Sequence, residues 1–367
     1  MAAQRHVTGA PCMTHSEEII GDLRAPFPWF GGKSAIADVV WKRFGEPENF
    51  VEPFFGSGAV LLARRCIGKT ETVNDKDHYV ANFWRAVQRD PEAVTRHADW
   101  PVNETDLHAR HLWLLTEGAA RLREIEGNPD LFDAQVAGWW VWGACAWIGS
   151  GWCSGRGPWQ WGASGWVKAD GDDVEKARPH FGNGRGINRQ LPHLSAGRGI
   201  NRQLPHLSAG RGQFIADWIG KLAYRLRDVR VAAGDWSRVC GPAVTHRHGT
   251  TAVFLDPPYA DTAGRTEGLY ATDCTQVAHD VRRGAIEQGD NPLMRICLAG
   301  YDGEHAMPET WETVEWKASG GYGSQGDDED GLGRVNAARE RLWFSPHCLK
   351  VEKQASLFDL MLVDAAE

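Results

Sequence analysis

The sequence predicts an α/β fold in which helices cover the faces of a mostly parallel sheet. Between residues 49 and 88 the pattern runs strand, glycine loop, helix, strand, helix, an order typical of the βαβ units that build parallel sheets. Residues 251–255 form an apolar segment of the kind found in strands buried on both faces. The chain has 367 residues, of which 42% are hydrophobic and 24% charged. This composition is that of an ordinary globular protein, and the length suits one large domain with an insertion, or two domains.

Periodicity and turn residues place the individual elements. Helices are predicted at residues 34–44 (with Ser34 as a possible N-cap), 59–66, 77–88, 104–126, 134–148, 214–226 and 277–288. Strands are predicted at residues 49–52, 70–73, 229–232, 251–255, 293–298, 310–317 and 340–344. The helix at 134–148 is apolar and rich in tryptophan, which favours a buried position.

Bulk properties exclude several classes of protein. The net charge of −8 argues against a general polyanion binder, although a local basic groove is still compatible with it. The eight cysteines form no C-x-x-C pair, so a zinc ribbon is not expected and no metal site is predicted. Scattered cysteines and no run near the roughly 20 apolar residues of a membrane span favour a reduced protein of the cytoplasm. Residues 1–25 are predicted to be a flexible leader.

A basic, loop-rich segment lies in the middle of the chain. Residues 184–196 read GRGINRQLPHLSA, and residues 197–209 repeat them letter for letter. Between Arg178 and Arg230 ten cationic side chains accompany two acidic ones, a local charge of +8. One interpretation is a duplication in a tolerant, solvated loop. The other is a loop that follows a nucleic-acid backbone, because arginine suits phosphates and guanine edges. The candidate contacts are Arg185, Arg189, Arg198, Arg202 and Arg211.

The segment Asp256-Pro257-Pro258-Tyr259 directly follows the apolar strand. The amino group on a nucleobase is a poor nucleophile because its lone pair is delocalised into the ring. The Asp256 carboxylate and the Pro257 carbonyl are suited to accept both N–H groups and to direct that lone pair towards a methyl donor. The two prolines stiffen the loop, and Tyr259 offers a ring on which an extruded base can stack. The competing interpretation is a plain turn that ends a strand.

A glycine loop follows the first predicted strand, in the segment Glu52-Pro53-Phe54-Phe55-Gly56-Ser57-Gly58. Glycines allow the backbone to approach a ligand closely. Asp75 lies 19 positions after Gly56, at the end of the next strand, where a carboxylate can bind ribose hydroxyls. Alternatives are an ordinary strand–helix turn and a helix N-cap at Asp75. Further upstream, Trp29-Phe30-Gly31-Gly32-Lys33 combines an aromatic ring, a flexible turn and a cation.

Together these segments resemble the N6-adenine-specific DNA methyltransferase family of the Dam and DpnII type, the D12 class. That family carries W-x-G-G-K, then E-P-F-x-G-G/S-G, then an acidic residue in N-D/A-D, then D-P-P-Y. This chain has W-F-G-G-K, E-P-F-F-G-S-G, N-D-K-D and D-P-P-Y in the same order. The resemblance spans about residues 26–346 and is strong only at these segments.

The resemblance implies a Rossmann-like S-adenosylmethionine-dependent methyltransferase sheet with an inserted, largely helical and loop-rich target-recognition domain. It implies a catalytic domain at 26–76 and 231–350, recognition at 77–230 and a tail at 351–367. It implies S-adenosylmethionine as cofactor, bound at Trp29, Lys33, Glu52, Pro53, Phe54, Gly56, Gly58, Asp75 and Asp235, the last from a G-D-W segment. The catalytic residues would be Asp256, Pro257, Pro258 and Tyr259.

The implied activity is methylation of adenine N6 at a specific site in double-stranded DNA, by a monomer from a bacterium or a phage-infected cell, as in restriction–modification systems. An N4-cytosine methyltransferase shares the mechanism, although S-P-P-Y is commoner there. N-P-P-Y is usual for methylation of protein glutamine or RNA. Methylation of cytosine C5 needs an activated cysteine nucleophile, and Cys12, in the leader, is a poor candidate. A catalytically inactive DNA-binding relative is the remaining alternative.

Overall fold

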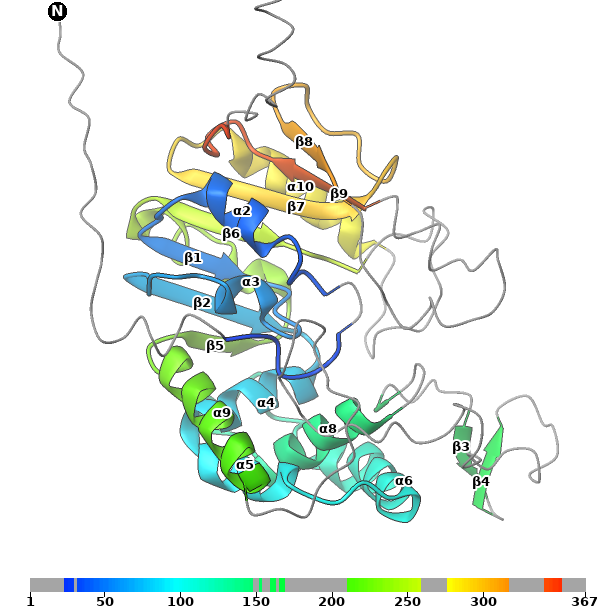
Figure 1. Cartoon of the computed structure of the whole chain (residues 1–367). Coiled ribbons are helices and arrows are strands. Elements are labelled where there is room, and N and C mark those ends of the chain that lie inside the picture. The colour runs from blue at the N-terminus through cyan, green and yellow to red at the C-terminus, as the bar shows by residue number, and fades with distance from the viewer. Residues whose placement is uncertain are drawn as a thin grey trace, which may run out of the picture.

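The computed structural model describes residues 23–29, 32–147, 152–153, 159–162, 165–168, 210–258, 276–316 and 340–351. Seven strands in this part of the chain form one sheet, in the order β5-β2-β1-β6-β7-β9-β8 (Figure 1). They are β1 (Asn49–Glu52), β2 (Thr70–Asp75), β5 (Arg230–Ala233), β6 (Thr251–Leu255), β7 (Met294–Tyr301), β8 (Glu312–Glu315) and β9 (Glu340–Phe344).

Most strand pairs of the sheet are parallel. β1 pairs in parallel with β2 and with β6, and β5 and β7 extend the sheet in parallel on the two sides. β9 runs antiparallel to both β7 and β8, so it is the one reversed strand of this sheet. The predicted α/β class with a mostly parallel, Rossmann-like sheet is therefore confirmed. The carboxyl ends of β1, β2, β5 and β6 meet along one edge, where parallel α/β sheets bind ligands.

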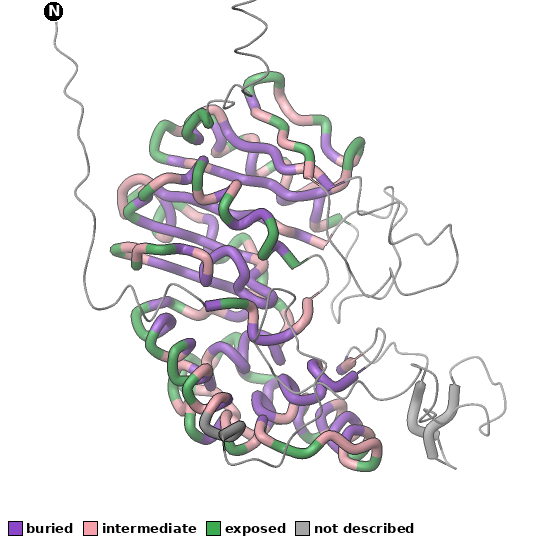
Figure 2. Tube along the Cα trace, in the orientation of Figure 1, coloured by how far each residue is buried: buried purple, intermediate pink, exposed green. Residues whose placement is uncertain are grey.

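Side chains of the central strands alternate between two hydrophobic cores. Phe50 and Phe254 point into the larger core, whereas Val51 and Val253 point into the smaller one on the opposite face. This alternation follows from the two-residue period of a strand, and both faces are buried (Figure 2). Burying one such aromatic or aliphatic side chain contributes about 1.5–3 kcal/mol.

Three helices precede or connect neighbouring strands of the sheet. Helix α2 (Ala37–Phe44) precedes β1, α3 (Ala59–Leu62) connects β1 to β2, and α10 (Val277–Gly289) lies between β6 and β7. The connection from β2 to β5 carries the other helices. They are α4 (His78–Arg89), α5 (Pro91–Ala98), α6 (Glu104–Trp113), a π-helical turn η1 (Leu114–Gly118), α7 (Ala119–Arg121), α8 (Ala134–Ala146) and α9 (Gly210–Leu226). They gather beyond β5 at one side of the sheet (Figure 1), and the larger core extends into them. Two short 3₁₀ helices, η3 (Trp236–Val239) and η4 (His246–His248), lie between β5 and β6.

Local capping explains where several of these helices begin. Asp77 accepts a hydrogen bond from the Tyr79 N–H at the start of α4, and Asp133 caps α8 through the Val136 N–H. Asp90 caps α5, which has proline at its first position. Helix α5 is not among the helices predicted from the sequence, although this Asp-Pro pair is a typical helix start.

Several predicted boundaries are wrong. Ser34 is not an N-cap, since α2 begins at Ala37 after Ile36 and has no side-chain cap. The helix predicted at 59–66 ends at Leu62, and the one predicted at 104–126 breaks into α6, η1 and α7. No strand was predicted between residues 73 and 229, but β3 (Trp159–Gly162) and β4 (Gly165–Lys168) form an antiparallel hairpin there.

A buried ion cluster joins α9 to the sheet. The Arg225 guanidinium donates to both carboxylate oxygens of Glu71 on β2, at 2.6 and 3.0 Å, and Arg64 donates to Glu71 at 2.9 Å. We call Glu71, Arg64 and Arg225 the Glu71 cluster. Arg225 is 1% exposed, so this member of the basic segment 178–230 is structural and is not available to a nucleic acid.

The described residues can also be compared with what the composition predicted about cysteines, membrane spans and metal sites. Six cysteines lie in the described residues, and all six are free thiols. No helix among the described residues is long and apolar enough to cross a membrane. No cluster of three or more histidine, cysteine or acidic side chains in that same part of the chain could hold a metal ion.

Candidate functional site

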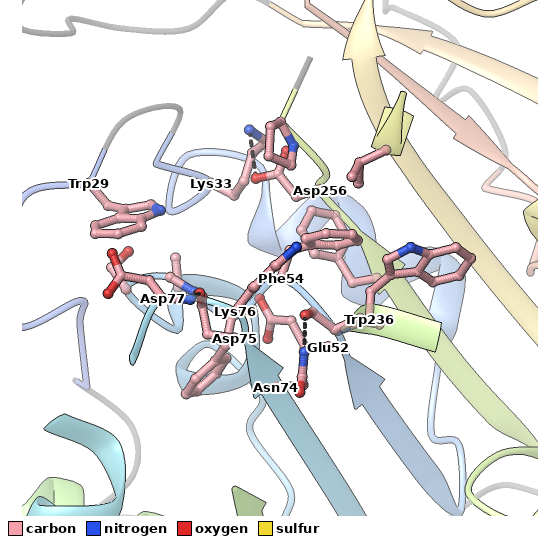
Figure 3. A pocket seen from close by; sticks show the side chains of 18 of the residues that line it. Trp29, Lys33, Glu52, Phe54, Asn74, Asp75, Lys76, Asp77, Trp236 and Asp256 are labelled. Carbon is pink, nitrogen blue, oxygen red and sulfur yellow. Dashed lines mark hydrogen bonds and ion pairs between the residues drawn. The ribbon is translucent and has the colours of Figure 1, made fainter. Parts of the chain in front are cut away.

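A pocket lies at the carboxyl ends of β1, β2, β5 and β6, with about 950 Å³ of space between its walls, part of it open to solvent. Its lining residues are Trp29, Gly32, Lys33, Glu52, Pro53, Phe54, Phe55, Gly56, Ser57, Ala59, Asn74, Asp75, Lys76, Asp77, Gly234, Asp235, Trp236, Phe254, Asp256, Pro258 and Val277. We call it the strand-end pocket. Trp29 lies on one side, Phe54 and Trp236 on the other, and Glu52, Asp75 and Asp77 between them (Figure 3).

The glycine loop after β1 is held by hydrogen bonds to the next strand. The Gly56 N–H donates to Asp75 Oδ2 at 2.8 Å, and the Phe55 N–H donates to the Asn74 carbonyl at 2.9 Å. Gly56 has φ +48°, and a Cβ there would overlap the Trp29 ring. Only glycine therefore allows both this backbone turn and the close approach of Trp29.

Asn74 ties the loops after two strands together. Its Nδ2 donates to the Pro53 carbonyl and to the Gly234 carbonyl, each at 3.0 Å, while its buried Oδ1 has no hydrogen-bond partner among the described residues. The loop after β1 and the loop after β5 are thus fixed relative to each other on opposite sides of Asn74.

Three carboxylates in the pocket have raised pKa values. Burial, and then the nearby Asp77 carboxylate, raises the pKa of Asp75 to about 7. Burial raises the pKa of Glu52 well above its usual range, although the Leu61 N–H donates to Glu52 at 3.2 Å and acts in the other direction. Burial likewise raises the pKa of Asp77. Each of these groups is costly to ionise in an empty pocket, so a positively charged ligand would be bound favourably here.

Asp75 does not act as a helix N-cap, which was the alternative role for it. Asp77 caps α4 instead, while Asp75 accepts from the backbone of Gly56 and of Asp77. Each carboxylate oxygen has two lone pairs, so Asp75 keeps acceptor capacity for a ligand. Asp235 accepts from the Ser237 N–H and hydroxyl, and these two bonds lower the pKa of Asp235. It therefore both begins η3 and lines the pocket.

Asp256 lies at the end of β6 and faces this pocket. The Lys33 ammonium lies 3.0 Å from Asp256 Oδ2 (Figure 3), and only 4% of Lys33 is exposed. Burial alone would lower the pKa of Lys33, but the charges of Asp256 and Glu340 outweigh burial, so the net pKa of Lys33 is raised. The lysine is therefore a cation, and it stabilises the ionised form of the Asp256 carboxylate.

Most of the predicted cofactor and catalytic residues lie around this one pocket. Those among its lining residues are Trp29, Lys33, Glu52, Pro53, Phe54, Gly56, Asp75, Asp235, Asp256 and Pro258. Gly58 and Pro257 are described but do not line it. Gly58 instead has φ +72° at the start of α3, where a Cβ would meet the Phe55 ring at 2.8 Å.

The remaining predicted site residues fall in parts of the chain that the structure does not describe. Tyr259, Arg185, Arg189, Arg198 and Arg202 are outside the described residues, and so is the side chain of Arg211.

Several other residues of the pocket are not among those predicted from the sequence. Asn74, Lys76 and Asp77 are the other three residues of the N-D-K-D segment that contains Asp75, and Trp236 completes the G-D-W segment. Their neighbours had been selected by spacing, so the signal was present in the same segments. Phe254 and Val277 carry no such signal, because single apolar residues of a strand or helix look alike in sequence.

Comparison with known families gives one match. Residues 29–111 match the model of the D12 class N6 adenine-specific DNA methyltransferases. The matched segment contains Trp29, Lys33, the glycine loop and Asp75, and it ends before Asp256. No curated protein matches the chain. Over residues 29–111 the chain is similar to this family, which confirms the resemblance drawn from the sequence.

Proposed function

We propose that the protein transfers a methyl group from S-adenosylmethionine to N6 of adenine at a specific sequence in double-stranded DNA. The observation that carries this proposal is the position of Asp256. Its carboxylate faces the same pocket as the glycine loop, although 200 residues separate it from Gly56 in the chain. An acceptor for the target amino group and a site for the methyl donor are therefore adjacent.

The lining of the pocket fits S-adenosylmethionine. This cofactor has a flat adenine ring, ribose hydroxyls and two cationic groups, and it supplies an electrophilic methyl group on a sulfonium. Phe54 and Trp236 offer rings whose planes differ by 26°. Five acidic side chains line the pocket with only two lysines, and one of these lysines is paired with Asp256. The excess of carboxylates favours a cationic ligand.

The chain's own groups account for activation of the adenine. The Asp256 carboxylate accepts a hydrogen bond from the N6 amino group and directs the nitrogen lone pair towards the methyl donor. Lys33 holds that carboxylate in place and ionised. We further propose that the Pro257 carbonyl accepts the second N–H and that Tyr259 stacks on the extruded base. Gly58 shapes the backbone turn that presents the loop.

The proposed division of the chain follows the topology. Residues 26–76 and 231–350 contain the strands of the large sheet, apart from Arg230 at the start of β5, and all residues that line the strand-end pocket except Asp77. Residues 77–230 connect β2 to β5, which are neighbours in that sheet, so this region is an insertion between paired strands. We propose that this insertion recognises the DNA, and that the arginines of the repeat contribute phosphate contacts.

The decisive experiment measures label transfer from radiolabelled S-adenosylmethionine to DNA. Digestion of the labelled DNA to nucleosides identifies the base, so N4-methylcytosine would replace the adenine assignment, and no transfer would favour an inactive DNA-binding relative. The Asp256→Ala variant should lose transfer by about 10³-fold or more and still bind the cofactor measurably. Near-normal turnover of this variant would contradict the mechanism.

A further inference from the structure

A second pocket lies in the helical region, away from the large sheet. Its lining residues are Arg96, His97, Trp100, Asp106, Ala109, Arg110, Trp113 and Trp139. They come from α5, the α5–α6 loop, α6 and α8, and the walls enclose about 880 Å³, much of it open to solvent. We call it the Arg110 pocket. Helices α6 and α8 lie beyond the β5 side of the sheet (Figure 1).

The Arg110 guanidinium is buried without a polar partner. The residue is 8% exposed, its Nη1 is fully buried, and among the described residues the guanidinium forms no hydrogen bond or ion pair. Instead its central carbon lies over three indole rings, 4.9 Å from Trp100, 4.9 Å from Trp139 and 4.5 Å from Trp142. Burial lowers the pKa of Arg110 to about 10, which leaves it cationic at neutral pH. A cation whose N–H donors lack acceptors is suited to a ligand that brings acceptors.

The Asp106 carboxylate lies one helical turn before Arg110 and attracts it electrostatically, but among the described residues no hydrogen bond or close ion pair joins the two. Acidic and basic side chains four residues apart on a helix usually form an ion pair. Here Asp106 Oδ2 accepts from Trp100 Nε1 and from Asn103 Nδ2 at 2.7 Å, and Oδ1 accepts no hydrogen bond from the described residues. The pocket therefore presents unused donors on Arg110 and an unused acceptor on Asp106, on the same side of α6.

The ligand that matches these walls is flat and carries acceptors beside donors. Guanine has the acceptors O6 and N7 on one edge and the donors N1–H and N2–H₂ on the adjoining edge. A phosphate fits less well, because Asp106 would repel it and indole walls do not hydrate it. A cationic ligand is disfavoured by Arg110 and Arg96, both in the wall. Trp100 is 45% exposed and offers a ring face at the rim for stacking.

We propose that the Arg110 pocket binds a guanine base, with O6 and N7 on Arg110, the N1 and N2 donors on Asp106, and the ring against Trp100. Contact with both edges requires a guanine that is not base-paired. We take the source to be the DNA strand beside the methylated adenine; this choice of source rests on the proposed function, whereas recognition of the base does not.

The test measures binding of the full-length protein to short, fluorescently labelled, single-stranded oligonucleotides by anisotropy, without cofactor. A thymine tract with one central guanine is compared with tracts carrying adenine, hypoxanthine or 7-deazaguanine at that position. Hypoxanthine lacks the N2 donors, and 7-deazaguanine lacks the N7 acceptor. We expect each replacement to weaken binding several-fold, and adenine to weaken it by roughly tenfold or more.

Variants assign each loss to one side chain. Arg110→Lys keeps the charge but lacks the two-pronged donor edge, so it should abolish the difference between guanine and 7-deazaguanine. Asp106→Ala removes the acceptor and should abolish the difference between guanine and hypoxanthine. Trp100→Ala, at an exposed position, should weaken binding of the guanine tract by several-fold without unfolding the protein. Arg123→Lys, an exposed arginine outside the pocket, is the matched control and should change neither difference.

The outcomes separate this proposal from the proposed function. Equal weakening of all four oligonucleotides by Arg110→Lys would mean a phosphate contact and would overturn the guanine assignment. Equal affinity of the unmodified protein for all four, together with no competition by free guanosine monophosphate, would also overturn it. Competition by free guanosine monophosphate but not adenosine monophosphate, with no preference among the oligonucleotides, would support the base assignment and make a free nucleotide its source. Methyl transfer and cofactor affinity are measured in parallel, so an inactive enzyme with intact guanine preference would refute only the proposed function.

Discussion

The Glu71 cluster and the Arg110 pocket each place an arginine near a carboxylate inside the protein, with opposite results. In the cluster, Arg225 and Glu71 share two hydrogen bonds, and Arg64 adds a third to Glu71. In the pocket, Arg110 and Asp106 are one helical turn apart and do not meet, and Arg110 faces indole rings instead. Burial of an arginine therefore does not reveal its role.

What separates the two regions is whether the hydrogen-bonding capacity is used. A buried charge whose bonds are satisfied holds elements together, and its loss leaves the partner charge unpaired. A buried charge whose bonds are unused costs stability, and this cost is recovered only when a ligand binds. The strand-end pocket contains both kinds: Lys33 is paired with Asp256, whereas Glu52 and Asp75 are hard to ionise without a cationic ligand.

The largest expected effect concerns stability. Glu71→Gln should lower the free energy of unfolding by about 3–5 kcal/mol, because it leaves two arginines without their buried counter-charge. Arg110→Met should change it by about 1 kcal/mol or less, since the lost cation–π contacts are offset by removal of an unsolvated charge. Urea denaturation measures both. Arg283→Gln, at an exposed pair, is the control and should be nearly neutral. Similar losses from Glu71→Gln and Arg110→Met would break the distinction between the two regions.

The next effect concerns the paired charge of the strand-end pocket. Lys33→Gln should lower kcat about 100-fold, which corresponds to an increase of about 2.7 kcal/mol in the activation free energy. The same variant should change cofactor affinity by less than about threefold. The reason is that the Lys33 ammonium contacts Asp256, the residue that we propose acts on the target base. Steady-state kinetics and cofactor titration separate the two quantities. If cofactor affinity fell and kcat did not, Lys33 would be a cofactor ligand, as the sequence resemblance alone implies.

A smaller effect is expected from the glycine loop. Gly56→Ala should weaken cofactor binding about 10- to 100-fold, because alanine is strained at φ +48° and its methyl group would displace Trp29. Gly220→Ala in α9 is the matched control, since a Cβ there has nothing within 4 Å. Calorimetric titration of both variants with cofactor checks the prediction, and equal affinities would show that the loop does not contact the cofactor.

The smallest effect is a pH dependence from Asp75. Its pKa of about 7 in the folded protein lies above its ordinary 3.8, so the folded state binds an extra proton between these values. Its contribution to stability therefore falls as pH rises from about 4 to 7. Cofactor affinity should instead rise with pH. It should be up to about tenfold higher at pH 8 than at pH 6, because the protonated carboxyl present at the lower pH does not attract a cation. Asp75→Asn should flatten this profile; an unchanged slope would assign the titration to another group.

Much of the fold was predictable from local patterns. The bounds of β1, β6 and β9 agree with the predicted ranges, because each is a short segment that a proline follows within two residues. The break of the 104–126 helix at η1 was not predictable, since a π-helical turn leaves no mark in apolar spacing. The early end of α3 likewise depends on packing and not on local preference.

The sequence alone determined which segments to look for: contiguous segments carry the glycine loop, Asp75 and Asp256, and their residue types and order predicted that they share one site, as the lining of the strand-end pocket bears out. Only the tertiary structure decided the partners: that Lys33 pairs with Asp256, that Arg225 belongs to Glu71, and that Arg110 lacks an acceptor. The physical reason is that a charged side chain is recognised from local sequence, whereas its hydrogen-bond partner is supplied by segments that only folding brings near.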